Sequence, residues 1–200
     1  SYQTDKLILT AGPHIQSLLP SFKPKLTITR QLIGWLNPSC WQDFSIDDFP
    51  CWVIEEEGIP GIYYGFPILP IEGFAGPIGL KIAYHAPGEV IEPQKVKWFD
   101  GSQEAERLLA VSRRYFRDQK MTMLNISSCM YTYSSDDDFI IDYLPQTDEK
   151  IILATGFSGH GFKFVPAIGD VLSKMARGLS GEVDLTFLSI DRFGDQEYLI

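Results

Sequence analysis

The sequence predicts an α+β fold, in which a mainly antiparallel sheet is flanked by two pieces of an α/β layer. Continuous apolar runs of strand length near each end of the chain, the second followed by a helical pattern, predict the outer layer. Alternating aromatic and β-branched runs between them, punctuated by Gly and Pro, predict the antiparallel sheet. The middle of the chain therefore separates two segments that belong together.

Each of the two outer segments begins with a strand. The first strand is expected at 6–10 and leads into a brief helical stretch, but the residues just after it supply no neighbours for so apolar a strand. The second strand is expected at 151–155, followed by a glycine-rich bend at 156–161 and a helix with Pro166 near its first turn and Gly178 as its stop. The apolar stripe of that helix consists of Ile168, Val171, Leu172, Met175 and Ala176.

The middle part is expected to be rich in strands, with one interrupting helix. That helix is predicted at about 103–118, with Asp100 and Ser102 as cap candidates. Its inner face carries Leu108, Val111 and Tyr115. The predicted strands lie at 27–36, 51–55, 62–66, 78–84 and 122–133, and the turn-rich stretches at 58–61 and 67–77.

Composition narrows the class of function. Among 200 residues, 26 Asp+Glu against 17 Lys+Arg give a net charge of −9, which is the wrong sign for binding phosphates, so no nucleic-acid partner is expected. No apolar run approaches the ~20 residues of a membrane span, and the first residues lack the pattern of a secretion signal, so a cytoplasmic protein is expected. The cysteines are odd in number and have no metal-site spacing, which agrees with that compartment and predicts no metal; they are Cys40, Cys51 and Cys129.

One candidate site lies on the strand predicted at 78–84. Alternation places Lys81, Ala83 and His85 on one face and Leu80, Ile82 and Tyr84 on the other. Lys81 and His85 are then about 13 Å apart, at ~3.3 Å of rise per residue. That separation spans a substrate or a flat cofactor. The alternative is an exposed strand face on which both side chains are simply solvated.

A second candidate is the glycine-rich bend at 156–161, where backbone can approach a ligand and free amides can meet an anion or a polar ring edge. Its spacing differs from the G-x-G-x-x-G fingerprint of dinucleotide loops, and a tight turn between strand and helix explains it equally well. Lys163, just beyond the bend, is either a point charge for a carboxylate or a solvated lysine.

Cys129 and the run 136–138 are the remaining candidates. Cys129 has aromatic and apolar neighbours in sequence, so it is either a nucleophile or a small buried hydrophobe. The three consecutive aspartates resemble a metal cluster only superficially, because consecutive residues converge poorly on one ion. We interpret them as a solvated acidic turn.

These segments also carry a family resemblance. They are 61–67 (GIYYGFP), 79–81 with 84–85 (GLK and YH), 129–132 (CMYT), 139–142 (FIID) and 156–164 (GFSGHGFKF). In this order they resemble the monomeric sarcosine oxidase and N-methyltryptophan oxidase family, within the D-amino-acid-oxidase-like FAD-dependent oxidoreductases. The match covers nearly the whole chain but corresponds to only the C-terminal half of a family member.

The resemblance implies a domain organisation. Residues 1–19 are then a remnant of the FAD-binding domain, 20–128 the substrate-binding domain, and 129–200 the C-terminal part of the FAD-binding domain. The dinucleotide loop, the ribose-binding acid and a carboxylate-clamping arginine of the family are expected in the missing N-terminal half. Without that loop, the chain alone is expected to bind FAD poorly and, with its half-layer exposed, to self-associate.

The resemblance also implies an activity, the oxidation of an N-methyl amino acid. A hydride leaves the N-methyl carbon for the flavin, the imine hydrolyses to formaldehyde, and O2 reoxidises the flavin to give H2O2. The stretch 67–80 is longer than expected in sarcosine oxidases, which leaves the substrate open. The alternative is a non-catalytic binding or partner module, or an inactive fragment, that lacks the dinucleotide loop.

Roles for individual residues follow from the same resemblance. Cys129 matches the cysteine that joins the flavin through a thioether, which requires a thiolate and hence a lowered pKa. Lys81 matches the lysine beside flavin N5 that promotes O2 reduction. His85 and Tyr64 match residues near the bound amino acid and are assigned with Lys81 to catalysis. The other expected cofactor or substrate contacts are Met130, Tyr131, Gly156, Gly159, His160, Gly161 and Lys163.

Overall fold

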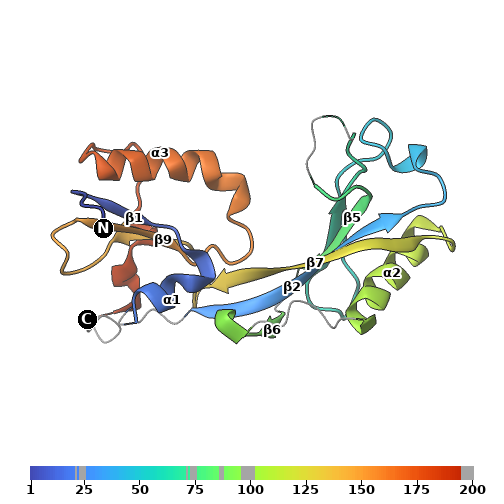
Figure 1. The fold of residues 1–200 in the computed structure, drawn as a ribbon, viewed down its shortest axis with the longest axis horizontal. Coiled ribbons are helices and arrows are strands. Elements are labelled where there is room, and N and C mark those ends of the chain that lie inside the picture. The colour runs from blue at the N-terminus through green and yellow to red at the C-terminus, as the bar shows by residue number, and fades with distance from the viewer. Residues whose placement is uncertain are drawn as a thin grey trace. The chain divides into compact units, whose positions relative to one another are not determined.

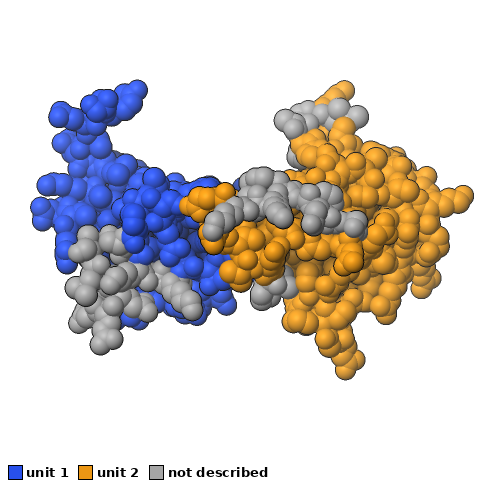
Figure 2. All heavy atoms as spheres, turned by 60° about the horizontal axis from the view of Figure 1, so that its bottom comes forward, with its two compact units in different colours: residues 1–29, 131–200 blue, residues 30–130 orange. Residues whose placement is uncertain are grey.

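The structure is a computed structural model that describes residues 1–20, 22, 26–70, 72, 76–85, 88–95 and 102–194. The chain forms two compact units, coloured blue and orange in Figure 2: unit 1 comprises 1–29 and 131–200, and unit 2 comprises 30–130. The sequence placed these divisions after residues 19 and 128. Both observed divisions fall inside long strands, where an unbroken strand pattern gives no turn or change of composition to mark them.

Unit 2 is built on an antiparallel sheet with the strand order β3-β4-β5-β2-β6, and β7 pairs with β2 (Figure 1). This confirms the mixed sheet-and-helix class and the antiparallel sheet expected in the middle of the chain. The strands are β2 (Thr27–Asn37), β3 (Trp52–Ile54), β4 (Ile62–Phe66), β5 (Leu80–His85), β6 (Glu89–Val90) and β7 (Thr122–Tyr133).

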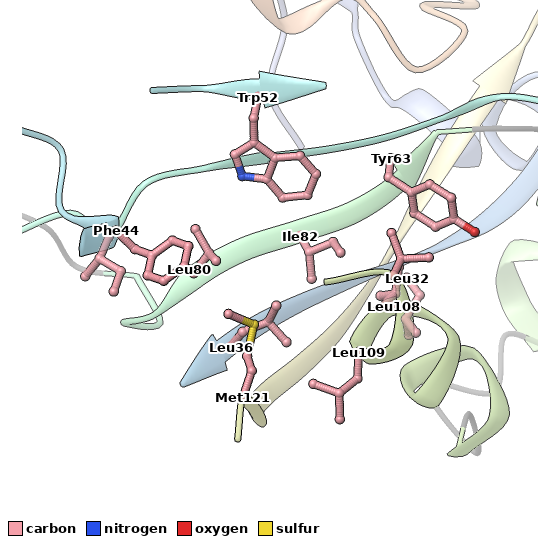
Figure 3. Packing of buried hydrophobic residues seen from close by; sticks show 12 residues of the cluster. Leu32, Leu36, Phe44, Trp52, Tyr63, Leu80, Ile82, Leu108, Leu109 and Met121 are labelled. Carbon is pink, nitrogen blue, oxygen red and sulfur yellow. The ribbon is translucent and has the colours of Figure 1, made fainter. Parts of the chain in front are cut away.

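Helix α2 (Ser102–Phe116) packs its apolar face toward this sheet and closes the core of unit 2. Leu108 and Val111 are buried as predicted, and Figure 3 shows Leu108 close to Leu32 of β2. Tyr115, also expected on the inner face, is instead 40% exposed, and its hydroxyl donates a hydrogen bond to Glu56 Oε1. The cap candidate Asp100 lies outside the described residues. Other members of the core are Leu36, Phe44, Trp52, Tyr63, Leu80, Ile82 and Met121.

Unit 1 contains a three-stranded sheet with the order β1-β9-β8. The strands β1 (Leu7–Leu9) and β9 (Ile151–Thr155) are parallel, as expected for two pieces of one α/β layer, and β8 (Ile140–Tyr143) is antiparallel to β9. In β1, Leu7 and Ile8 are 43% and 38% exposed, although their apolar character is typical of a buried strand.

Helix α3 (Val165–Ala176) lies over β1 and β9 in Figure 1. The predicted stripe packs on buried residues of β8 and β9, with Leu172 in the cluster itself and Ile168, Val171, Met175 and Ala176 against it. The helix ends at the predicted glycine: Gly178 has φ +65°, and the amide of Leu179 donates to the carbonyl of Lys174 at 2.9 Å. This bond, together with that from Gly178 to Met175, forms a Schellman cap.

The remaining elements are short. Helix α1 (Ile15–Leu18) follows β1. Within the described ranges, no helix is long and apolar enough to cross a bilayer. The 3-10 turns are Gly12–His14, Gln42–Phe44, Pro93–Lys95, Phe162–Phe164, Thr186–Leu188 and Ile190–Phe193.

Candidate active site

One face of the sheet in unit 2 collects the residues expected to meet flavin and substrate. Strand pairing sets Phe66 opposite Lys81, Tyr64 opposite Ala83, and Ile62 opposite His85. Because residues directly opposite each other in a sheet share a face, Tyr64, Lys81 and His85 point to the same side. The intervening residues, including Tyr63, Leu80 and Ile82, enter the core on the opposite side.

The aromatic rings on this face form a continuous row. Lys81 Nζ lies 4.9 Å from the centroid of the Phe66 ring. The ring of Tyr64 meets that of Phe66 edge-on at 6.2 Å and that of His85 nearly perpendicularly at 6.4 Å. The row therefore leads from Lys81 through Phe66 and Tyr64 to His85. Sequence reasoning missed Phe66, although its alternation with Tyr64 on β4 could have placed it there.

Cys129 lies near Lys81 although the two residues are far apart in sequence. Cys129 is half-buried on β7, which pairs with β2, and β2 pairs in turn with β5. Burial raises the pKa of the Cys129 thiol above its usual value, and the positive charge of Lys81 opposes that shift. Burial likewise lowers the pKa of Lys81, against the opposing influence of Cys129.

The raised pKa of the Cys129 thiol is opposite in direction to the lowered pKa expected for it beside a cofactor. The pKa rises because the free energy lost when a thiolate is removed from water exceeds the stabilisation that one neighbouring cation provides. In this state Cys129 favours the protonated form, and its activation as a nucleophile requires a change in its surroundings.

In unit 1 the predicted bend follows β9 and is fastened by Ser158. Gly156, Ser158 and Gly159 all have positive φ values, of +66°, +47° and +78°. The amide of Ser158 donates to the carbonyl of Thr132 at 2.9 Å, and its hydroxyl donates to the carbonyl of Gly156 at 3.1 Å. The bend is thus held against the end of β7.

The glycines of the bend are required by the packing of the chain itself. A Cβ atom at Gly159 would come within 2.5 Å of the Tyr131 ring, and one at Gly161 within 2.6 Å of the Phe157 ring. The tight-turn interpretation therefore accounts for both glycines without a ligand, and any contact with a cofactor would be an additional use of the same backbone.

The other predicted residues of unit 1 lie around this bend. His160 is exposed, with its ring 4.9 Å from that of Phe139, and it lines an apolar cavity of about 340 Å³ between α3 and residues 183–188. Lys163 is exposed, and its Nζ lies 5.4 Å from the centroid of the Phe164 ring. The predicted site residues thus form two groups, one in each unit, with the half-buried Met130 in the group of unit 2.

The aspartate run at 136–138 has a structural role. Arg192 donates to both carboxylate oxygens of Asp136, from Nε at 2.7 Å and from Nη2 at 3.1 Å. These bonds, with one from Ser134, hold the pKa of Asp136 at about 2. In the part of the chain that the structure describes, no group of His, Cys, Asp or Glu residues could hold a metal ion.

Comparison with known proteins decides the family. A family model described as FAD dependent oxidoreductase matches residues 1–175. This chain belongs to the FAD-dependent oxidoreductase family. It is 36% identical over 197 residues to a monomeric sarcosine oxidase of Bacillus sp. (strain B-0618) and 32% identical over 195 residues to an N-methyl-L-tryptophan oxidase of Yersinia pestis (strain Pestoides F). Each match covers 96% of the chain but 48% and 49% of the relative, so the chain spans about half the length of these proteins.

Solved structures of two oxidases share the fold of the chain. The iminodiacetate oxidase of Chelativorans sp. BNC1 superposes with a TM-score of 0.68 at 16% identity, covering 94% of this chain and 46% of that one. NikD, an amino acid oxidase of nikkomycin biosynthesis, has a TM-score of 0.69 at 20% identity, covering 92% and 47%.

The residues present suit the cofactor of the family. Among the described residues, buried side-chain polar atoms without a hydrogen-bond partner include Ser128 Oγ and Thr155 Oγ1. Ser128 directly precedes Cys129, and Thr155 directly precedes the bend at 156–161. Buried polar groups are normally satisfied, so each predicted cofactor segment is directly preceded by a hydroxyl oxygen that still has capacity for a hydrogen bond. The aromatic row beside Lys81 suits the packing of a flat ligand.

Proposed function

We propose that this chain is the C-terminal half of a flavin-dependent amine oxidase that oxidatively demethylates N-methyl amino acids. The observation that carries the proposal is that Cys129 and Lys81 lie on one sheet, close enough for their charges to influence each other, beside the aromatic row that ends at His85. Relatives named as sarcosine and N-methyl-L-tryptophan oxidases support the substrate class.

The overall reaction balances without a further reactant. A secondary amine R–NH–CH3, O2 and water give R–NH2, formaldehyde and H2O2. The amine loses two electrons, O2 gains two electrons and two protons, and water supplies the oxygen of formaldehyde. The chemistry that FAD supplies when bound is the transfer of these two electrons from the amine to O2.

Lys81 acts in the oxygen half of this reaction. The first electron delivered to O2 creates a superoxide anion, and a fixed ammonium group stabilises that developing charge. Among the described residues, no carboxylate forms an ion pair with Lys81, so none of them neutralises its charge. Partial burial strengthens its field relative to that of a solvated lysine.

Tyr64 and His85 act in the amine half of the reaction. Their perpendicular rings form a wall on the face of Lys81, against which a small amine can be oriented and shielded from water. In unit 1, the exposed ammonium of Lys163 is proposed to bind the substrate carboxylate, with Tyr131 as a further wall.

Cys129 is proposed to hold FAD through a thioether to its 8α-methyl carbon. Formation of that C–S bond removes one hydrogen from the thiol and one from the methyl group, and O2 takes up both as H2O2. Because burial favours the protonated thiol, the attachment is expected to be slow until a bound cofactor changes the surroundings of Cys129.

Retention of flavin after denaturation tests this attachment. Acid-precipitated complete protein should stay yellow, whereas Cys129→Ser should release its flavin to the supernatant or contain none. Cys51→Ser, at an exposed cysteine, is the matched control and should retain colour. Colour that washes out of the wild-type precipitate would contradict the covalent link.

A further inference from the structure

We propose that Phe66 is a positioning residue that holds the Lys81 ammonium group on the reactive face of the sheet. The inference rests on the proposed function, because it assigns Phe66 a part in the oxygen half of that reaction. Three observations support it: the register that sets Phe66 opposite Lys81, the short distance between the Phe66 ring and the Lys81 ammonium group, and the aromatic rather than acidic nature of this neighbour.

The register brings aromatic residues to both sides of Lys81. Phe66 of β4 and Trp35 of β2 are its two cross-strand partners, and β5 lies between these strands. The three side chains therefore share one face. Trp35 is half-buried, whereas Phe66 is 39% exposed. Of the two neighbours of Lys81, Phe66 is therefore the one that lies on its more solvent-exposed side.

The ring of Phe66 is in a position to bind the ammonium. Lys81 Nζ lies 4.9 Å from its centroid, within the ~6 Å range of cation–π attraction. Tyr64 meets Phe66 edge-on, with an interplanar angle of 90°, and so restrains the ring from the other side. Phe66, at the surface of the sheet, thus contacts both the ammonium group and a neighbouring ring.

An aromatic partner suits the task of Lys81 better than an acid would. A carboxylate would fix the ammonium but cancel the charge that stabilises a developing anion. A ring restrains the long lysine side chain through its quadrupole and leaves the net charge in place. Phe66 therefore restrains the Lys81 side chain without neutralising its positive charge.

The test uses the complete, flavin-loaded protein and separates its two half-reactions by stopped-flow. Phe66→Leu should slow reoxidation of the reduced flavin by O2 roughly 3- to 30-fold, as expected for loss of a cation–π contact. Anaerobic reduction by the amine should change far less than reoxidation, because Phe66 reaches the amine half only through its contact with Tyr64. Phe66→Tyr keeps a ring and should reoxidise like the wild type. Tyr115→Leu, at an aromatic residue of similar exposure on α2, is the control and should change neither rate.

A double-mutant cycle identifies the group through which Phe66 acts. In a Lys81→Met background, adding Phe66→Leu should slow reoxidation no further, because the ammonium that the ring holds is already gone. An equal effect of Phe66→Leu in both backgrounds, or none in either, would overturn the inference and leave the proposed function standing. Wild-type reoxidation in Lys81→Met would overturn both.

Discussion

At the scale of single residues, burial and charge act against each other at Cys129 and Lys81. Each group is taken partly out of water, which favours the neutral form of both, while their mutual attraction favours the charged forms. Burial prevails in each case. A flat ligand on this face would therefore meet a neutral thiol and a lysine whose proton is held less firmly than in water.

Lys81 offers the sharpest kinetic prediction. Lys81→Met should slow flavin reoxidation by O2 on the order of 10²-fold, the usual cost of removing one group that stabilises a developing anion. Anaerobic reduction should change far less, because the amine is oxidised before oxygen reacts. Stopped-flow absorbance measures both steps, and equal slowing of the two would argue against the role given to Lys81.

Asp136 makes acid stability a second test at this scale. Its pKa falls from 3.8 to about 2 in the folded chain, mainly through Arg192, so its contribution to stability is complete above pH 4 and is lost as the pH falls through about 2. Asp136→Asn should lower the free energy of unfolding at pH 7 by about 0.5–1 kcal/mol, since the pair is partly exposed. The difference should shrink below pH 3 in urea titrations; a pH-independent difference would refute the ion-pair explanation.

At the scale of elements, hydrophobic periodicity predicted most of the architecture. The strands at 62–66, 122–133 and 151–155 have the predicted bounds, and α3 packs through the predicted stripe. Periodicity reports which side of an element is apolar but not which residue lies opposite it on the next strand. For that reason the sequence alone could not place Phe66 beside Lys81, which follows from the register of β4 and β5. The burial that raises the thiol pKa of Cys129 likewise became visible only in the structure.

The packing of α3 gives a stability prediction. Leu172→Ala should cost about 2–4 kcal/mol, because it removes a buried side chain from the cluster between α3 and the sheet of unit 1. Ser173→Ala, at the next and exposed position of the same helix, should be nearly neutral. Urea unfolding monitored by circular dichroism measures both, and equal losses would show that the stripe does not carry the packing.

At the scale of the whole molecule, unit 1 presents an incompletely covered sheet. In the described part of the chain β1 is an edge strand, and its Leu7 and Ile8 are partly exposed. Apolar edges of this kind favour pairing with another chain. The chain spans about half the length of the curated relatives that it matches, and in those relatives the additional residues are available to cover such an edge.

The purified 200-residue chain is therefore expected to self-associate. Light scattering should show an average mass that rises with concentration, and Ile8→Lys should reduce the rise by placing a charge on the exposed strand. A constant monomer mass over a wide concentration range would contradict this expectation.

The central claim is that Cys129 holds FAD within reach of Lys81, and one mass measurement tests it directly. Trypsin cleaves after Lys120 and Lys150, so Cys129 is the only cysteine of the peptide 121–150. In the complete flavin-loaded protein, this peptide should carry the mass of FAD less two hydrogens and show flavin fluorescence. An unmodified peptide from protein whose flavin is fully released on denaturation would contradict the claim.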